Sequence, residues 1–128
     1  MKRAIHSDGA PKAIGPYSQA AAVAGAVYLS GQIGLEPSSG ELVAGGVEAE
    51  TRRVMENLEA VLAAAGLDFA AVVKTTIFLA DLADFAAVNQ IYGSYFEDPK
   101  PARSTVQVAA LPRGARVEID AIAVRVAE

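Results

Sequence analysis

The chain alternates strand-like and helix-like segments with no linker or internal repeat between them, and this alternation limits the available folds more than any other feature. A strand is predicted where β-branched residues gather, as in VVKTTIFLA at 72–80, and a helix where apolar residues recur every three or four positions. The predicted elements are strands at 25–32, 72–80, 104–111 and 116–126, and helices at 47–65 and within 81–96 with Asp84 as the N-cap.

This order of elements predicts an α+β fold in which one domain, residues 1–128, holds a mixed β-sheet with both helices packed on one face. A domain of this size has no third layer with which to cover the other face of the sheet. We therefore expect further copies of the chain to cover that face, which predicts a homo-oligomer.

Composition excludes several kinds of site. Cysteine is absent, which removes thiolate nucleophiles and cysteine-bound metals, and the only histidine is His6, which we expect at the surface. Since a catalytic zinc usually has histidine among about three protein ligands, we expect no metal and no cofactor. The formal net charge of −4 disfavours a nucleic-acid surface. No apolar run approaches the roughly 18–20 residues of a membrane span, so we expect a cytoplasmic protein without a membrane partner.

Two strand-like segments carry a charged residue at or beside an apolar run: Arg103 in PARSTVQV and Glu118 in VEIDAIAV. A buried charge costs several kcal/mol unless it is paired or used. An arginine and a glutamate placed in this way indicate a site that holds a small anion and moves a proton.

An ordered set of motifs along nearly the whole chain resembles the RidA (YjgF) family. Each short motif alone is weak evidence, but their order and spacing together are specific. They include IGPYSQA at 14–20, SGQI at 30–33, VKTT at 73–76, PARS at 101–104, Leu111-Pro112 and EIDAIA at 118–123.

The resemblance implies a fold similar to Bacillus chorismate mutase, with the last strand between the first two predicted strands and away from its sequence neighbour. It also implies a homotrimer with active sites in clefts between subunits. The implied reaction is hydrolytic deamination of 2-imino acids, such as 2-iminopropanoate and 2-iminobutanoate derived from 2-aminoacrylate and its homologue. The products are 2-keto acids and ammonia.

Arg103 and Glu118 suit that chemistry. The planar guanidinium of Arg103 can hold a carboxylate through two parallel hydrogen bonds, although an ordinary interface salt bridge is the alternative. Glu118 can accept a proton from the attacking water. The alternative for Glu118 is a solvent-facing carboxylate, because it shares a polar strand face with Arg116 and Asp120. How Arg103 and Glu118 meet one substrate is not fixed by the sequence.

Five further residues complete the candidate site. Tyr17 follows a Gly-Pro turn and can donate its hydroxyl to the substrate, or else it closes the core. Ser30 and Gly31 end a strand where the backbone can approach a ligand closely, although Gly31 also suits a simple turn. Asn89 either reaches a pocket or is solvated on its helix. Thr105 lies on the Arg103 face of its strand and can offer a hydroxyl to the carboxylate; some relatives carry cysteine at the matching position.

Three classes of function follow: an imine deaminase that depends on Arg103, Glu118 and Tyr17, a non-catalytic 2-keto-acid-binding sensor, and a ribonuclease. A glutamate near the arginine favours chemistry over simple retention of a ligand. The acidic charge and the 6% aromatic content disfavour RNA binding. The sequence thus favours the deaminase.

Overall fold

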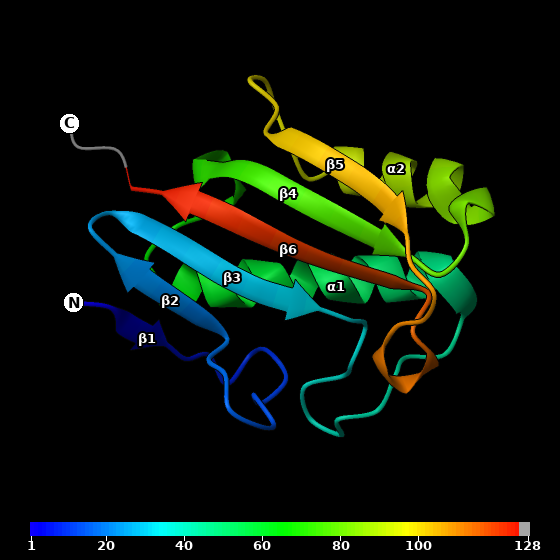
Figure 1. The fold of residues 1–128 in the computed structure, drawn as a ribbon, viewed down its shortest axis with the longest axis horizontal. Helices are drawn as coiled ribbons and strands as arrows, with labels where there is room; N and C mark the ends of the chain where they lie inside the picture. The colour runs from blue at the N-terminus through cyan, green and yellow to red at the C-terminus, as the bar shows by residue number, and fades with distance from the viewer. Residues whose placement is uncertain (126–128) are drawn as a thin grey trace.

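The computed structural model describes residues 1–125, which form six strands and two α-helices (Figure 1). The end of the last predicted strand, Val126, lies outside the described residues. The helices are α1 (Gly46–Ala64) and α2 (Phe85–Gly93), and short 3₁₀ turns span Phe69–Ala71, Leu82–Asp84 and Pro112–Gly114. The strands are β1 (Arg3–Ile5), β2 (Ala20–Val23), β3 (Ala26–Gln32), β4 (Val72–Leu79), β5 (Ala102–Gln107) and β6 (Val117–Val124).

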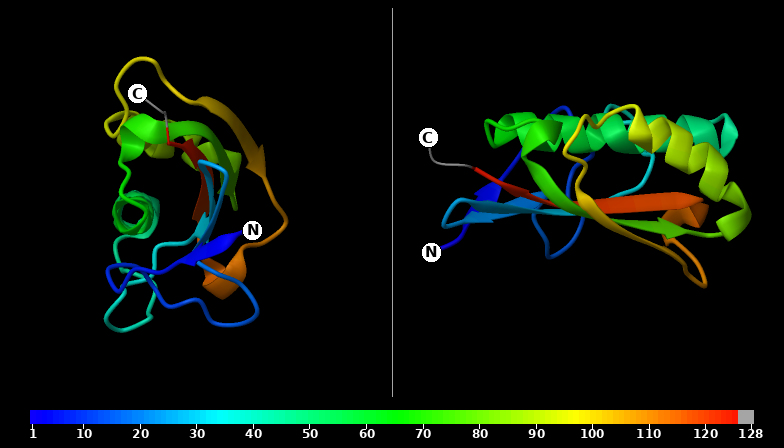
Figure 2. Two further views of the ribbon diagram at one scale, coloured as in Figure 1. Left: turned by 90° about the vertical axis from the view of Figure 1, so that its left-hand side faces the viewer. Right: turned by 90° about the horizontal axis from the view of Figure 1, so that it is seen from above.

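All six strands of residues 1–125 join one sheet in the order β1-β2-β3-β6-β4-β5. β4 and β5 run parallel, while the other pairs are antiparallel, so the predicted mixed sheet is confirmed. Both helices cover the same face (Figure 2), as expected from the order of elements. The last strand lies between β3 and β4 and is separated from β5 by β4, which is the placement that the family resemblance implies.

The core lies between the sheet and α1. Residues at three- and four-position steps on α1, such as Val54, Leu58 and Val61, are fully buried, and they pack on the inward-facing residues of β6. β6 alternates buried and half-buried positions along its length, so Val117 and Ile119 face the helices while Glu118 faces away. Fully burying each such side chain stabilises the fold by roughly 1.5–3 kcal/mol.

The sequence interpretation missed β1 and β2. β2 consists of three alanines and a valine, which carry little strand preference of their own, and β1 has only three residues. Pairing with β3, where Ala20 lies opposite Leu29, therefore decides their conformation.

Asp84 is the N-cap residue of α2, as predicted, but its side chain makes no capping hydrogen bond. Its two carboxylate oxygens instead accept from Nη2 of Arg116 at 2.9 and 2.8 Å. The capping carboxylate belongs to Asp81, which accepts from the backbone N–H of Ala83 at 2.8 Å and starts the 3₁₀ turn before the helix.

The face of the sheet opposite the helices carries two apolar cross-strand pairs, which are separated by polar residues because Ile122 lies opposite Lys74 and Phe78 lies opposite Glu118. Tyr28 of β3 pairs with Ile122 of β6, and Phe78 of β4 pairs with Val106 of β5. Tyr28 is 50% exposed and Val106 is 42% exposed. No helix of the described residues combines the length and apolar character that crossing a membrane requires.

Candidate active site

A cavity of about 590 Å³ opens where β3 ends and β6 begins. It brings together four of the predicted site residues: Tyr17, Ser30, Gly31 and Glu118. Its remaining walls combine apolar residues and two glutamines with two cations that sequence reasoning did not assign to the site: Pro11, Lys12, Ile14, Gln19, Gln32, Ile33, Leu35, Pro112 and Arg113.

Glu118 lies directly against Gly31 across the β3–β6 pair. The strand register shifts between Leu29 and Gln32, and this irregularity brings the Gly31 backbone up to the Glu118 side chain. A Cβ atom at position 31 would lie 2.8 Å from Cδ of Glu118, closer than two carbon atoms approach. Gly31 is therefore needed to leave room for the carboxyl group, which is a different reason from the close ligand approach that the sequence indicated.

Burial raises the pKa of Glu118, and the negative charge of Asp120, two residues along the same strand face, raises it further. The raised pKa makes the ionised carboxyl a better proton acceptor than an exposed glutamate. This half-buried position contradicts the alternative of a simply solvent-facing carboxylate. The electrostatics of the cavity thus suit proton transfer.

The segment that carries Tyr17 is fastened to the end of β3. The hydroxyl of Ser30 donates to the carbonyl of Ser18 at 2.6 Å, and the backbone N–H of Ser30 donates to the carbonyl of Gln19 at 2.9 Å. Tyr17 itself is 53% exposed, so the alternative that it closes the core is wrong. Ser30 therefore positions Tyr17. Because the Ser30 hydroxyl already donates its proton to Ser18, it can only accept a hydrogen bond from a substrate.

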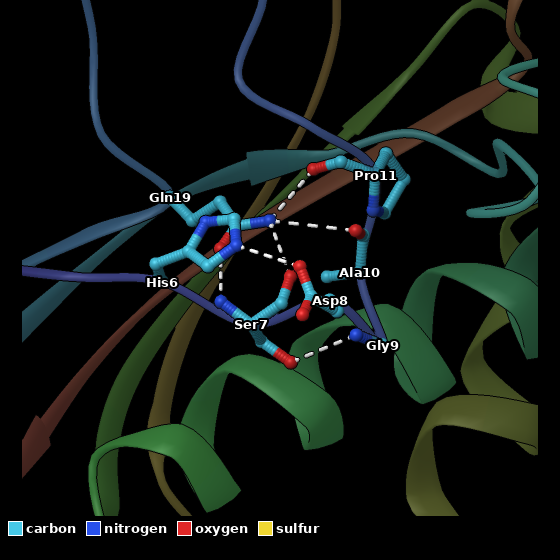
Figure 3. Close-up of polar contacts among 7 residues, drawn as sticks. All are labelled: His6, Ser7, Asp8, Gly9, Ala10, Pro11 and Gln19. Atoms are coloured by element: carbon cyan, nitrogen blue, oxygen red, sulfur yellow. Dashed lines mark hydrogen bonds and ion pairs between the residues drawn. The ribbon is translucent and has the colours of Figure 1, made fainter.

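Gln19 is a positioning residue that sequence reasoning missed (Figure 3). Its side-chain oxygen accepts from the backbone N–H of Ser7 at 2.6 Å, and its side-chain nitrogen donates to the carbonyls of Ser7 at 3.1 Å and Pro11 at 2.7 Å. Gln19 is only 2% exposed. It thereby fixes the loop that supplies Pro11 and Lys12 to the cavity wall. His6, in the same close-up, contacts Asp8 at the surface, as expected.

Arg103 belongs to a second cluster, on the edge strand β5 beside α2. Its Nη1 donates to the side-chain oxygen of Asn89 at 2.7 Å. The guanidinium carbon lies 5.5 Å from the ring centre of Phe85 and 5.1 Å from that of Tyr92, within the range of cation–π attraction. Within residues 1–125 no carboxylate pairs with Arg103, so the structure offers no intrachain salt bridge in place of a ligand.

Asn89 and Thr105 both lie near this arginine. Asn89 is exposed on α2, yet it is not simply solvated, because its side-chain oxygen holds the Arg103 guanidinium. Thr105 follows Arg103 on the same strand face, and its buried Oγ1 has no hydrogen-bond partner among residues 1–125. An unpartnered buried hydroxyl costs free energy, so a ligand atom that bonds it stabilises the complex.

Arg103 and Glu118 do not meet within one chain. On the shared neighbour β4, Arg103 pairs with Thr75 and Glu118 pairs with Phe78, on opposite sides of the strand. Their Cα atoms are therefore roughly 14 Å apart, from strand spacing and rise.

The two side chains also point to opposite faces of the sheet. Arg103 contacts Asn89 and Tyr92 of α2, so it faces the helices. Glu118 alternates with the buried Val117, so it faces the uncovered side. No small substrate held by Glu118 can therefore reach Arg103 of the same chain.

The profile of the Endoribonuclease L-PSP family matches residues 7–125. The chain belongs to this family. It is 66% identical to Protein DfrA of Myxococcus xanthus, over 96% of this chain and 95% of that protein. It is 57% identical to the mouse (Mus musculus) 2-iminobutanoate/2-iminopropanoate deaminase, over 98% of this chain and 93% of that protein.

A solved member of this family confirms the fold. YyfA of Yersinia pestis, described as a member of the conserved Rid protein family, is 49% identical and superposes with a TM-score of 0.94. The match covers 97% of this chain and 99% of that one. The resemblance to the RidA family predicted from the motifs is thereby confirmed. Among the described residues, no group of three histidine, cysteine or acidic side chains is placed to hold a metal ion.

Proposed function

We propose that the chain hydrolyses reactive 2-imino acids, including 2-iminopropanoate and 2-iminobutanoate, to 2-keto acids and ammonia. The observation that carries the proposal is the half-buried Glu118, whose pKa is raised, in a cavity of suitable size beside Tyr17. The 57% identity to the mouse 2-iminobutanoate/2-iminopropanoate deaminase over nearly the whole chain supports the same activity.

The reaction joins the oxygen of one water to C2 of the imine and breaks the bond between C2 and nitrogen. Glu118 accepts a proton from the attacking water and passes it to the nitrogen, which gives a carbinolamine. The carboxylate then accepts the remaining hydroxyl proton and passes it to the same nitrogen as the C2–O bond becomes a carbonyl, so that ammonia leaves and the carboxylate is regenerated. Tyr17 donates its hydroxyl to the substrate. The carboxylate of the substrate binds Arg103 through two hydrogen bonds, with Thr105 supplying a further donor.

This assignment requires two subunits at each site, because Arg103 and Glu118 of one chain lie on opposite sheet faces. We propose a homotrimer in which the edge strand β5 of one subunit brings Arg103 and Asn89 to the Glu118 cavity of its neighbour. The exposed Tyr28 and Val106 on the uncovered sheet face support this arrangement, since exposed apolar side chains are stabilised by burial in an interface. We propose further that the chain is one domain and acts in the cytoplasm without nucleic acid.

The test generates 2-aminoacrylate with a coupled dehydratase and follows the imine that semicarbazide traps. Wild type should suppress trapping, and Arg103→Ala should not. The matched control is Arg52→Ala, which removes an exposed arginine of α1 that does not line the cavity. If verified wild-type trimer fails to suppress trapping of either small or larger imines, the deaminase assignment is wrong.

Two alternatives have distinct signatures. A keto-acid sensor would bind 2-oxobutanoate without turnover, so Glu118→Gln would change nothing in the trapping assay. The family description names an endoribonuclease. A net charge of −4 disfavours RNA binding by this chain. RNA cleavage is tested by incubating the same preparation with labelled single-stranded RNA.

A further inference from the structure

Two cations in the wall of the Glu118 cavity have no part in the hydrolysis proposed above. Lys12 and Arg113 both line the cavity, and Glu118 is the one acidic residue among its described lining residues. The α-carboxylate of the substrate is already assigned to Arg103. The cavity is therefore cationic in a chain of net charge −4, and its two extra positive charges favour a second anionic group on the ligand.

The backbone holds Arg113 in a conformation that non-glycine residues rarely adopt. Its φ of 62° and ψ of 17° lie in the left-handed region, and the following Gly114 is also left-handed, with φ of 69°. Such positions usually carry glycine, asparagine or aspartate. An arginine here keeps a long cationic side chain at the mouth of the cavity despite the backbone cost, and positions of this kind concentrate at ligand sites.

The guanidinium of Arg113 is available to a ligand. Nη2 donates to the carbonyl of Gly40 at 3.1 Å and lies 3.8 Å from Oε2 of Glu41, beyond hydrogen-bond distance. Both of these contacts use one nitrogen, and 47% of the side chain is exposed. An exposed pair of this kind contributes little stability, so a ligand anion can compete with it. Among residues 1–125, no acidic side chain pairs with Lys12.

The space beside Lys12 continues past the main cavity. A second hollow of about 240 Å³ shares Pro11, Lys12, Ile14 and Leu35 with it and extends to Gly40, which Arg113 contacts. The main cavity alone falls in the size range of pockets for drug-sized ligands, which exceeds a small 2-imino acid. A longer substrate therefore has both room and charge complementarity on this side.

We propose that Lys12 and Arg113 form a second anion subsite, which binds the side-chain carboxylate of dicarboxylic 2-imino acids such as 2-iminosuccinate and 2-iminoglutarate. The proposal rests on the deaminase function above and leaves its chemistry unchanged: water adds at C2, the C2–N bond breaks and ammonia leaves. Its substrates are the products of oxidation of acidic amino acids.

Binding of stable keto acids tests the subsite without turnover. Titration calorimetry compares 2-oxoglutarate with 2-oxobutanoate on wild type, Arg113→Asn and Lys12→Gln. Asparagine tolerates the left-handed backbone, and Arg52→Gln, on the outer surface of α1, is the control for a lost charge. Each cavity variant should weaken 2-oxoglutarate binding about tenfold relative to 2-oxobutanoate, as expected for one charged hydrogen bond.

The second measurement is the rate of hydrolysis of two imines, which amino-acid oxidases generate from glutamate and from 2-aminobutanoate. The ratio of kcat/KM for the dicarboxylic imine to that for the monocarboxylic imine should fall in the cavity variants and stay at the wild-type value in Arg52→Gln. The subsite is refuted if wild type binds 2-oxobutanoate but not 2-oxoglutarate, or if neither cavity variant changes the binding ratio. If both keto acids bind with the expected ratios and no imine is hydrolysed, the proposed function fails while the subsite stands.

Discussion

Replacement of Gly31 by alanine should lower kcat about a hundredfold while leaving the fold intact. The new Cβ would lie 2.8 Å from Cδ of Glu118, whereas carbon atoms pack at about 3.5–4.0 Å, so the carboxyl group must move by about 1 Å. A displacement of that size at a reacting group costs about a hundredfold in kcat. The φ of Gly31 is not in the left-handed region, so alanine adds no backbone strain, and overpacking costs only about 1–3 kcal/mol.

The assay is steady-state imine hydrolysis with urea unfolding of the same preparations. Gly93→Ala is the matched control, because a Cβ at Gly93, the last residue of α2, meets nothing within 4 Å. It should keep wild-type turnover and lose no stability. Wild-type kcat in Gly31→Ala would show that the carboxyl position is not critical and refute this reasoning.

Three further outcomes follow from the same contacts. Asp120→Asn removes the negative charge that raises the pKa of Glu118, so the acidic limb of the kcat/KM profile, below which Glu118 is protonated, should move to lower pH. Glu118→Gln should lose turnover without losing stability at neutral pH, because burial raises the pKa in the folded state and ionisation of Glu118 therefore opposes folding; a large loss of stability in urea unfolding would contradict this. Gln19→Leu leaves buried backbone groups unpaired and should lower the free energy of unfolding by about 3 kcal/mol, and a loss under about 1 kcal/mol would show that water replaces the amide.

Periodicity and β-branched composition were enough to predict the strands and helices that bury a regular stripe, as in β4 and α1. They were not enough for β2, because an alanine-rich segment has no strong preference and becomes a strand only by pairing with β3. The N-cap position of Asp84 was predicted correctly, but its hydrogen bonds were not, because a distant partner, Arg116, binds the carboxylate. Local sequence signals therefore predicted the elements whose side chains pack in a regular pattern. They did not predict the features that depend on residues distant in the sequence.

The candidate site divides in the same way. Tyr17, Ser30, Gly31 and Glu118 were named from motifs, but their convergence in one cavity depends on the strand order and on the register shift in β3. Gln19 was missed because its bonds go to backbone groups, which leave no pattern in the sequence; its one signal was a polar side chain directly before an apolar run.

The separation of Arg103 from Glu118 within one chain leads to a prediction about the oligomer. If each site takes Arg103 from one subunit and Glu118 from the next, neither Arg103→Ala nor Glu118→Gln homotrimers are active. In mixed trimers, about a quarter of the interfaces place an intact arginine against an intact glutamate. Co-expression of the two variants should therefore restore about a quarter of wild-type turnover per site, whereas sites within single chains would restore none. Because a single chain places the two groups on opposite sheet faces, a site that uses both groups requires at least two subunits.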